Sequence, residues 1–199
     1  MPLYIVSTPI GNRGDITKRA LETLAFCDVV LCEDTRKTGR LLDFYRMKPK
    51  PKLISFYEEN AEKRRPQVIS WLKESKKIAL VSNAGTPIIS DPGFKLVRHC
   101  RQENIAVFSI PGPAAFLAGL TISGLPIDKF MFLGFLPKKK GKKKTIFSSC
   151  LALKDTPLSP TFIFYESPYR LEKTLKLMKV FLGEARVVVA RELTKIHEE

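Results

Sequence analysis

Residues 3–14 read LYIVSTPIGNRG, an apolar run of strand length that passes directly into a loop rich in proline and glycine. Asp15 can cap an amphipathic helix that follows, because apolar residues recur there at helical spacing from Ile16 to Leu24. The same alternation continues along the chain, and Asp91-Pro92 supplies a second cap before a helix. Further strand-length runs lie at Asp28–Cys32, Leu53–Phe56, Lys77–Ser82 and Ile105–Ile110. This alternation predicts an α/β fold with a largely parallel sheet.

A second α/β segment follows a basic stretch. We expect a strand at Thr161–Tyr165, a helix that begins at Ser167-Pro168, and a strand at Arg186–Ala190. Residues 137–144 combine like charges with a proline and a glycine, so they are unsuited to form a helix or strand of the core. The sequence therefore predicts an N-terminal domain over 1–136 and a second domain over 137–199, entered through a lysine-rich linker at 137–144.

Composition narrows the functional class. The chain has 199 residues, 44% of them apolar, which is enough for a sizeable core. Its 34 Lys and Arg exceed 20 Asp and Glu, and the net charge of +14 favours a polyanionic partner. No apolar stretch approaches the roughly 20 residues needed to cross a bilayer, and no export signal begins the chain, so we expect a cytoplasmic protein without membrane contact. The four cysteines lack metal-site spacing, and we expect no metal: Cys27, Cys32, Cys100 and Cys150.

Three loops stand where an open α/β sheet binds ligands, after a strand and before a helix. They cover residues 7–14, 82–93 and 111–115. None carries the GxGxxG pattern of a nicotinamide site, and the chain has no GxxxxGK[ST] motif. Small residues and prolines let a backbone approach a ligand closely, although any one of these loops taken alone could be a simple turn. Together they predict one pocket at one sheet edge.

The same loops carry a resemblance to a known family. The matching stretches span nearly the whole chain and read LYIVSTPIGN (3–12), EDTR (33–36), AGTP (84–87), ISDPG (89–93), PGP (111–113), SGLP (123–126), FYESP (164–168) and ARELTK (190–195). This pattern is similar to that of the ribosomal RNA small subunit methyltransferase I family. The resemblance implies a two-domain tetrapyrrole-methylase-like fold, a homodimer, and S-adenosylmethionine-dependent methylation of a cytidine 2′-hydroxyl in the decoding region of 16S rRNA in the 30S subunit.

The resemblance also implies site residues. The cofactor would lie near Pro9, Ile10, Gly85, Thr86, Ile89, Ala114, Ala115, Phe164, Tyr165 and Ala190. Residues that could act as a base or orient the ribose are Glu33, Asp34, Arg36, Glu166, Arg191, Glu192 and Lys195. The chain departs from the family pattern at Asn83, commonly Asp, and at Ala114, commonly Ser. The pattern also continues beyond Glu199, so we expect the second domain to be incomplete.

Simpler interpretations stay open for two of these groups. Residues 33–36 could be a helix N-terminus with a surface ion pair. The lysine run could be a solvated linker, but its position favours contact with RNA by Lys138, Lys139, Lys140, Lys142, Lys143 and Lys144. Two other functions are compatible with the sequence: methylation of a small tetrapyrrole, or non-catalytic RNA binding during ribosome assembly.

Overall fold

The computed structural model describes residues 1–154 and 156–199. The chain divides into two compact units, Met1–Ala114 and Ala115–Glu199. The boundary therefore lies well before Pro137, the position that the sequence predicts. Residues 115–136 belong to the second unit because they form a helix and a strand that pack against its later elements.

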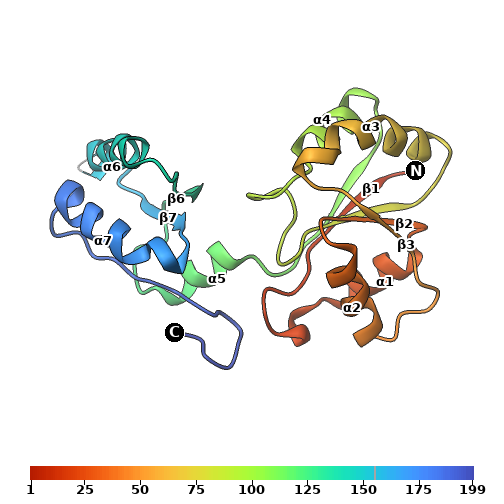
Figure 1. The fold of residues 1–199 in the computed structure, drawn as a ribbon, viewed down its shortest axis with the longest axis horizontal. Coiled ribbons are helices and arrows are strands. Elements are labelled where there is room, and N and C mark those ends of the chain that lie inside the picture. The colour runs from red at the N-terminus through yellow and green to blue at the C-terminus, as the bar shows by residue number, and fades with distance from the viewer. Residues whose placement is uncertain (155) are drawn as a thin grey trace. The chain divides into compact units, whose positions relative to one another are not determined.

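The first unit is a parallel five-stranded sheet with helices on both faces (Figure 1). Its sheet order is β3-β2-β4-β1-β5. The strands are β1 (Leu3–Val6), β2 (Val29–Cys32), β3 (Lys52–Ser55), β4 (Ile78–Val81) and β5 (Val107–Ile110). The helices are the 3-10 turn η1 (Arg13–Asp15), α1 (Lys18–Phe26), α2 (Thr35–Phe44), α3 (Glu58–Lys73) and α4 (Phe94–Gln102). The predicted α/β class is confirmed.

The order in which the chain adds strands to the sheet decides which face each helix covers. From β1 through β2 to β3, each new strand lies closer to the β3 edge of the sheet. From β3 through β4 to β5, each new strand lies closer to the β5 edge. Because parallel crossovers are right-handed, the two directions place their helices on opposite faces. Alternate residues of β2 accordingly enter two cores: Val29 and Leu31 join a cluster with Leu72 of α3, and Val30 joins one with Leu24 of α1.

Two helices begin later than the sequence predicted. Asp15 lies in η1, and Thr17 caps α1 by accepting a hydrogen bond from the N–H of Ala20 at 3.1 Å. Asp91 and Pro92 precede α4, whose N-cap is Gly93. A glycine stands there because the backbone has φ of +135°, a conformation that side chains rarely adopt.

Replacement of Gly93 by Ala should destabilise the first unit. The new Cβ would lie 2.6 Å from Leu80 Cδ2 and 2.9 Å from Ile88 Cγ1, so the core would have to shift. We expect a loss of about 1–3 kcal/mol in the free energy of unfolding, measured by denaturant titration. Gly141→Ala is the matched control, because nothing lies within 4 Å of its added Cβ. An equal effect at both glycines would contradict the steric argument.

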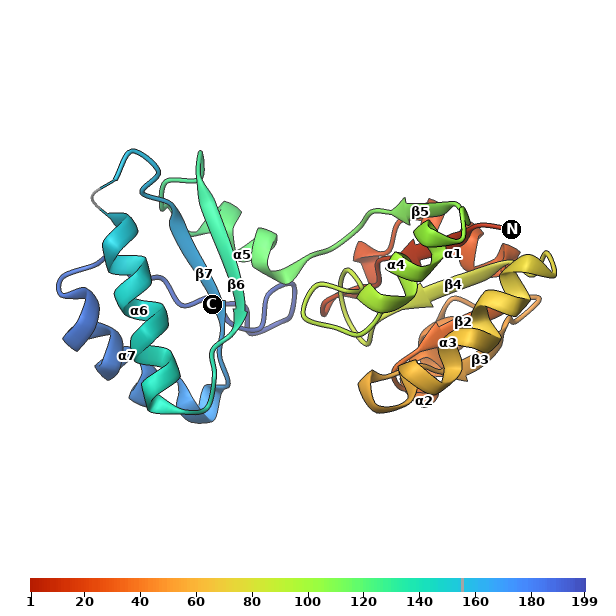
Figure 2. The same ribbon diagram turned by 90° about the horizontal axis from the view of Figure 1, so that it is seen from above.

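The second unit contains α5 (Ala115–Ile122), β6 (Phe130–Phe135), α6 (Lys140–Lys154), β7 (Thr161–Tyr165) and α7 (Pro168–Leu182). β6 and β7 pair in parallel, with an irregularity between Phe132 and Phe135. Figure 2 shows α6 and α7 on one side of these strands and α5 on the other. Aromatic contacts agree, since Phe132 stacks on Phe116 of α5 while Phe164 contacts Phe147 of α6.

Two expectations for the second unit were wrong. The lysine run is not wholly a linker, since α6 begins at Lys140 and includes the lysines that follow. Residues 186–190 form no strand. A strand needs a neighbour for its N–H and C=O groups, and none pairs with these residues within the described chain. No helix in the described ranges combines the length and apolar character needed to span a membrane.

Candidate functional site

The three predicted loops follow adjacent strands. β4, β1 and β5 are neighbours in the parallel sheet, so their carboxyl ends meet at one edge. The loops after them begin at Ser82, Ser7 and Pro111. The sheet order thus brings together segments more than 70 residues apart, as the loop spacing predicted, at the edge where open α/β sheets bind ligands.

The first and second loops are joined through their backbones. The N–H of Thr8 donates to Gly85 O at 2.9 Å, and the N–H of Gly85 donates to Thr8 O at 3.0 Å. Ser82 adds hydroxyl bonds to Ala84 O and Gly85 O, at 3.1 and 3.3 Å. Because Ser7, Thr8 and Ser82 are all buried, their polar groups need such partners. The loops therefore act as one preformed surface.

A chain of hydroxyl groups extends this surface to the third loop. The Thr86 hydroxyl donates to Pro113 O at 3.0 Å and lies 2.9 Å from the Ser7 hydroxyl. A hydroxyl has a single proton, so Thr86 must accept from Ser7 while it donates to Pro113. Thr86 is thus the residue at which all three loops meet.

Two glycines allow these loops to come close together. Gly85 has φ of +81°, and a Cβ there would lie 3.2 Å from Ile10 Cγ2. A Cβ on Gly112 would lie 2.9 Å from Ser7 Cβ. Side chains at either position would separate the loops, so glycine is required for close approach.

Strained backbone marks the second loop. Ile88 and Ser90 have φ of +77° and +64°, in the left-handed region. This region is rare for a β-branched residue such as Ile88. Strain of this kind gathers at ligand-binding and catalytic segments, where the surrounding structure imposes it. Ile89, between these residues, is 37% exposed and available for contact with a ligand.

The EDTR motif forms the N-terminus of α2 at the same edge. Asp34 caps the helix, accepting from the N–H groups of Arg36 and Lys37 at 2.9 and 3.4 Å. Arg36 also pairs with Asp34 through its side chain at 3.0 Å, and these hydrogen bonds lower the pKa of Asp34 to about 2. Asp34 and Arg36 therefore fit the simpler interpretation, a helix N-terminus with a surface ion pair. Glu33 is placed differently: its carboxylate accepts from the N–H of Asn83 at 3.1 Å, which links α2 to the second loop.

Asp91, which the sequence predicts only as a helix cap, is a partly buried carboxylate of the second loop. Burial, and then the negative charge of Glu33, raise its pKa to about 6, although a hydrogen bond with Ser82 opposes them. The sequence signal was its place within the second loop. Neither Glu33 nor Asp91 joins an ion pair within the described residues, and the same residues contain no group of three or more His, Cys, Asp or Glu that could hold a metal ion.

The raised pKa of Asp91 predicts a pH-dependent stability. The folded protein holds this proton more tightly than the unfolded chain, whose ordinary pKa is 3.8. Asp91 should therefore lower stability as pH rises from about 4 to 6. We expect Asp91→Asn to match the wild-type melting temperature near pH 4 and to exceed it at pH 7. A difference that does not vary with pH would contradict this assignment.

In the second unit, Tyr165 is placed by contacts with α5 and β6. Its hydroxyl accepts a hydrogen bond from the N–H of Phe116 at 3.2 Å, in the first turn of α5, which begins at Ala115. Its ring lies edge-on to Phe132, with centroids 4.9 Å apart. Phe164, on the opposite face of β7, contacts Phe147. Of the predicted cofactor residues in this unit, Ala115 and Tyr165 are close together, and Phe164 faces away from them.

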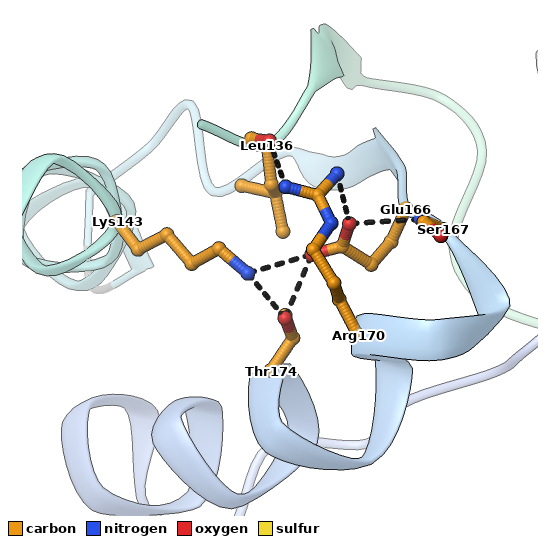
Figure 3. A network of polar contacts seen from close by, with 6 residues as sticks. All are labelled: Leu136, Lys143, Glu166, Ser167, Arg170 and Thr174. Carbon is orange, nitrogen blue, oxygen red and sulfur yellow. Dashed lines mark hydrogen bonds and ion pairs between the residues drawn. The ribbon is translucent and has the colours of Figure 1, made fainter. Parts of the chain in front are cut away.

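Glu166 lies in a buried polar network (Figure 3). Its carboxylate accepts from Lys143 and Thr174, both at 2.7 Å, and from the N–H of Ser167 at 2.8 Å. Arg170 pairs with the other carboxylate oxygen at 2.6 Å. Burial acts to raise the pKa of Glu166, but these hydrogen bonds outweigh it and the pKa is lowered. Glu166 is therefore committed to contacts within the protein, as is the predicted RNA-binding residue Lys143.

The last motif, residues 190–195, lies beside α5. A Cβ on Gly119 would lie 3.5 Å from Ala190 Cβ, so this glycine allows the segment to approach the helix. Arg191 pairs with Glu199 at 2.5 Å, and Lys195 pairs with Glu192 at 3.2 Å. These side chains are exposed and paired with one another.

Comparisons with known proteins agree with the resemblance seen in the sequence. The family model for tetrapyrrole (corrin/porphyrin) methylases matches residues 2–199. The chain is 48% identical over 197 residues to ribosomal RNA small subunit methyltransferase I of Thermotoga maritima, covering 99% of this chain and 85% of that protein. The proteins of the same name from Mesorhizobium japonicum and Escherichia coli O157:H7 are 49% and 47% identical, over 99% and 98% of this chain. The chain spans 65% and 66% of their lengths.

A solved structure shares the fold. The X-ray structure of cobalt precorrin-4 methyltransferase, a cobalamin biosynthetic enzyme, matches with a TM-score of 0.66 and 17% identity. The match covers 100% of this chain and 83% of that one. At this identity the likeness establishes the architecture and leaves the substrate open.

Proposed function

The chain belongs to the tetrapyrrole methylase family and, within it, to the ribosomal RNA small subunit methyltransferase I family, and we propose that it methylates the ribose 2′-hydroxyl of a cytidine in 16S rRNA, with S-adenosylmethionine as donor. The observation that carries this proposal is the preformed surface of three loops at one sheet edge. The relatives named for ribosomal RNA are 46–49% identical, whereas the tetrapyrrole enzyme is 17% identical. This difference favours RNA over a tetrapyrrole.

The residues at the sheet edge fit this cofactor. Loops of small residues and proline let backbone groups contact adenosine and methionine without intervening side chains. Glu33 and Asp91 add negative charge beside them, which suits the cationic sulfonium. The proposed cofactor contacts in the first unit are Pro9, Ile10, Gly85, Thr86, Ile89 and Ala114, and those in the second unit are Ala115, Phe164, Tyr165 and Ala190.

When bound, S-adenosylmethionine supplies an activated methyl group. The protein's main task is then to position the ribose hydroxyl, since correct placement alone can supply about 7–11 kcal/mol of the barrier. Of the proposed catalytic residues, Glu33 is the one that contacts the second loop, and Asp91 lies beside it. We propose Asp91 as the proton acceptor, because it lies in the second loop, hydrogen-bonds with Ser82 there, and has a raised pKa of about 6, which suits a base that works near neutral pH. Arg191, Glu192 and Lys195 would orient substrate, whereas Asp34 and Arg36 would hold the N-terminus of α2 and Glu166 would hold β7 in place.

Radiolabelled methyl transfer tests this proposal. Purified protein, 30S subunits and methyl-labelled S-adenosylmethionine should yield labelled 16S rRNA. A 2′-O-methyl group blocks alkaline cleavage at its own nucleotide, so the label should survive in an alkali-resistant dinucleotide containing cytidine. Label in alkali-labile mononucleotides would overturn ribose methylation. Transfer to a tetrapyrrole instead of RNA would indicate the sibling enzyme, and RNA binding without cofactor binding would indicate an assembly factor.

We further propose that the exposed lysines around the start of α6 bind RNA phosphates. Lys143 is 6% exposed and faces the interior, which leaves Lys138, Lys139, Lys140, Lys142 and Lys144. Replacing these five by Ala should weaken 30S binding and flatten its salt dependence by at most about 3.5 in log–log slope, at roughly 0.7 per phosphate. Cofactor affinity should not change. An unaltered slope would identify the segment as a solvated surface.

We also propose that the protein is a homodimer and that it acts in the cytoplasm. The family resemblance and the proposed RNA substrate support this. Light scattering at micromolar concentration should give twice the monomer mass, and a monomer mass would contradict it.

A further inference from the structure

A small hollow lies beside α2 in the first unit, and the three loops described above contribute only Arg13 to it. Its volume is about 200 Å³, and its lining consists of Arg13, Lys37, Arg40 and Leu41. Three of these four residues are cationic and exposed. Neither the predicted catalytic residues nor the lysine run contributes to it.

The fold holds Arg13 at this place by two contacts. The Tyr45 hydroxyl, at the end of α2, donates to Arg13 O in η1. The Arg13 guanidinium stacks over the Phe44 ring, 4.2 Å from its centroid. Lys37 and Arg40 are three residues apart on α2 and so lie on the same helical face. The three cations therefore converge from two segments that are tied together.

Two of the neighbouring carboxylates are engaged elsewhere, and a third, Asp15, has a buried oxygen without a hydrogen-bond partner. Asp34 pairs with Arg36, and Asp43 pairs with Lys50. Asp15, in η1, forms no ion pair with the hollow's cations, and those cations join no ion pair within the described residues. Three like charges around one concavity repel one another, and an anion bound between them would relieve this repulsion.

We propose that this hollow binds a phosphodiester of the RNA substrate, an inference that rests on the proposed function. Two guanidinium groups suit phosphate because their planar forks donate two hydrogen bonds each, and a lysine adds charge. Leu41 offers an apolar contact for the attached ribose. Arg13 is in the loop that follows β1, and Lys37 is in the first turn of α2, which follows β2, so both segments start from the sheet edge that carries the cofactor loops. The RNA backbone would cross this edge and be held beside the reacting nucleotide.

Salt-dependent binding tests the hollow. In the variant Arg13→Gln/Lys37→Gln/Arg40→Gln, 30S affinity at low salt should fall at least tenfold, and the log–log salt slope should lose about 0.7 for each phosphate released. The control Lys63→Gln/Arg98→Gln/Arg101→Gln removes the same charge from exposed positions of α3 and α4, and its slope should stay closer to the wild type. Equal changes in the two triple variants would overturn the site in favour of general charge attraction.

Further measurements distinguish a failure of the hollow from a failure of folding and from a failure of the proposed function. The double variant Lys37→Gln/Arg40→Gln keeps Arg13 on Phe44, so its slope change should persist even if the triple variant folds poorly. Cytidine monophosphate and polyglutamate should not displace RNA at matched charge; displacement by either would overturn recognition of an RNA phosphodiester. If the wild-type protein methylates 30S subunits while the double variant binds them unchanged, the hollow is refuted and the proposed function stands. If the wild type neither methylates nor binds them, the proposed function itself fails.

Discussion

Replacing Lys143 by Met should lower the free energy of unfolding by about 3 kcal/mol, the low end of the usual cost of breaking a buried ion pair, because Arg170 still pairs with Glu166. The Lys143 and Glu166 side chains are 8% and 7% exposed, and their charged atoms are 2.7 Å apart. The variant would leave the Glu166 carboxylate with Arg170, Thr174 and Ser167, but without the ammonium that balances it in the interior. Denaturant titration measures the loss.

Lys144→Met is the matched control, because the next residue along α6 is exposed. It should change stability by less than about 0.5 kcal/mol, as surface substitutions do. The double variant Lys143→Met/Glu166→Gln should be less destabilised than the sum of the two single variants, which would show that the two side chains interact directly. Full additivity would contradict the network.

Acid should reduce this effect. The folded-state pKa of Glu166 lies below its ordinary value of 4.5, so its stabilising contribution is present above that pH and lost as pH falls further. The gap between wild type and Lys143→Met should narrow below about pH 4.5. Because Glu166 directly follows Tyr165, which binds α5, the variant should also disturb the proposed cofactor contacts of the second unit.

Thr86→Trp should reduce S-adenosylmethionine affinity at least a hundredfold, equivalent to about 2.7 kcal/mol. The indole ring would occupy the point where the three loops meet. It cannot replace the hydroxyl that accepts from Ser7 and donates to Pro113. Calorimetric titration of the cofactor measures the effect.

Two further variants distinguish the effect of the bulky ring at residue 86 from the loss of hydrogen bonds and from misfolding. Thr86→Val keeps the shape and removes only the two hydrogen bonds, so its affinity should fall about thirtyfold or less, at roughly 1 kcal/mol for each bond. Ser148→Trp places the same ring on an exposed position of α6 and should bind the cofactor normally. Wild-type affinity in a folded Thr86→Trp protein would remove the cofactor from this sheet edge.

Much of the first unit could be predicted from the local pattern of apolar residues, prolines and glycines. The five apolar runs became five strands with ends shifted by one or two residues, since burial on both faces of a parallel sheet requires continuous apolar runs. The three loops were predicted at one edge, and the sheet order placed them there. Strand β6 was not predicted from the sequence. Its residues Phe130–Phe135 include Gly134, and its pairing with β7 is irregular.

The amino-acid sequence by itself determined the fold class, the family and the loops at the strand ends, because these depend on residue type and spacing along the chain. Tertiary structure alone decided the boundary after Ala114, the absence of a strand at 186–190 and the burial of Lys143 within a run of exposed lysines. It also decided that Asp91 lies close enough to Glu33 for its pKa to rise. The physical reason is common to all four: strand pairing, burial and pKa depend on which groups lie opposite in space, and the sequence places those groups far apart.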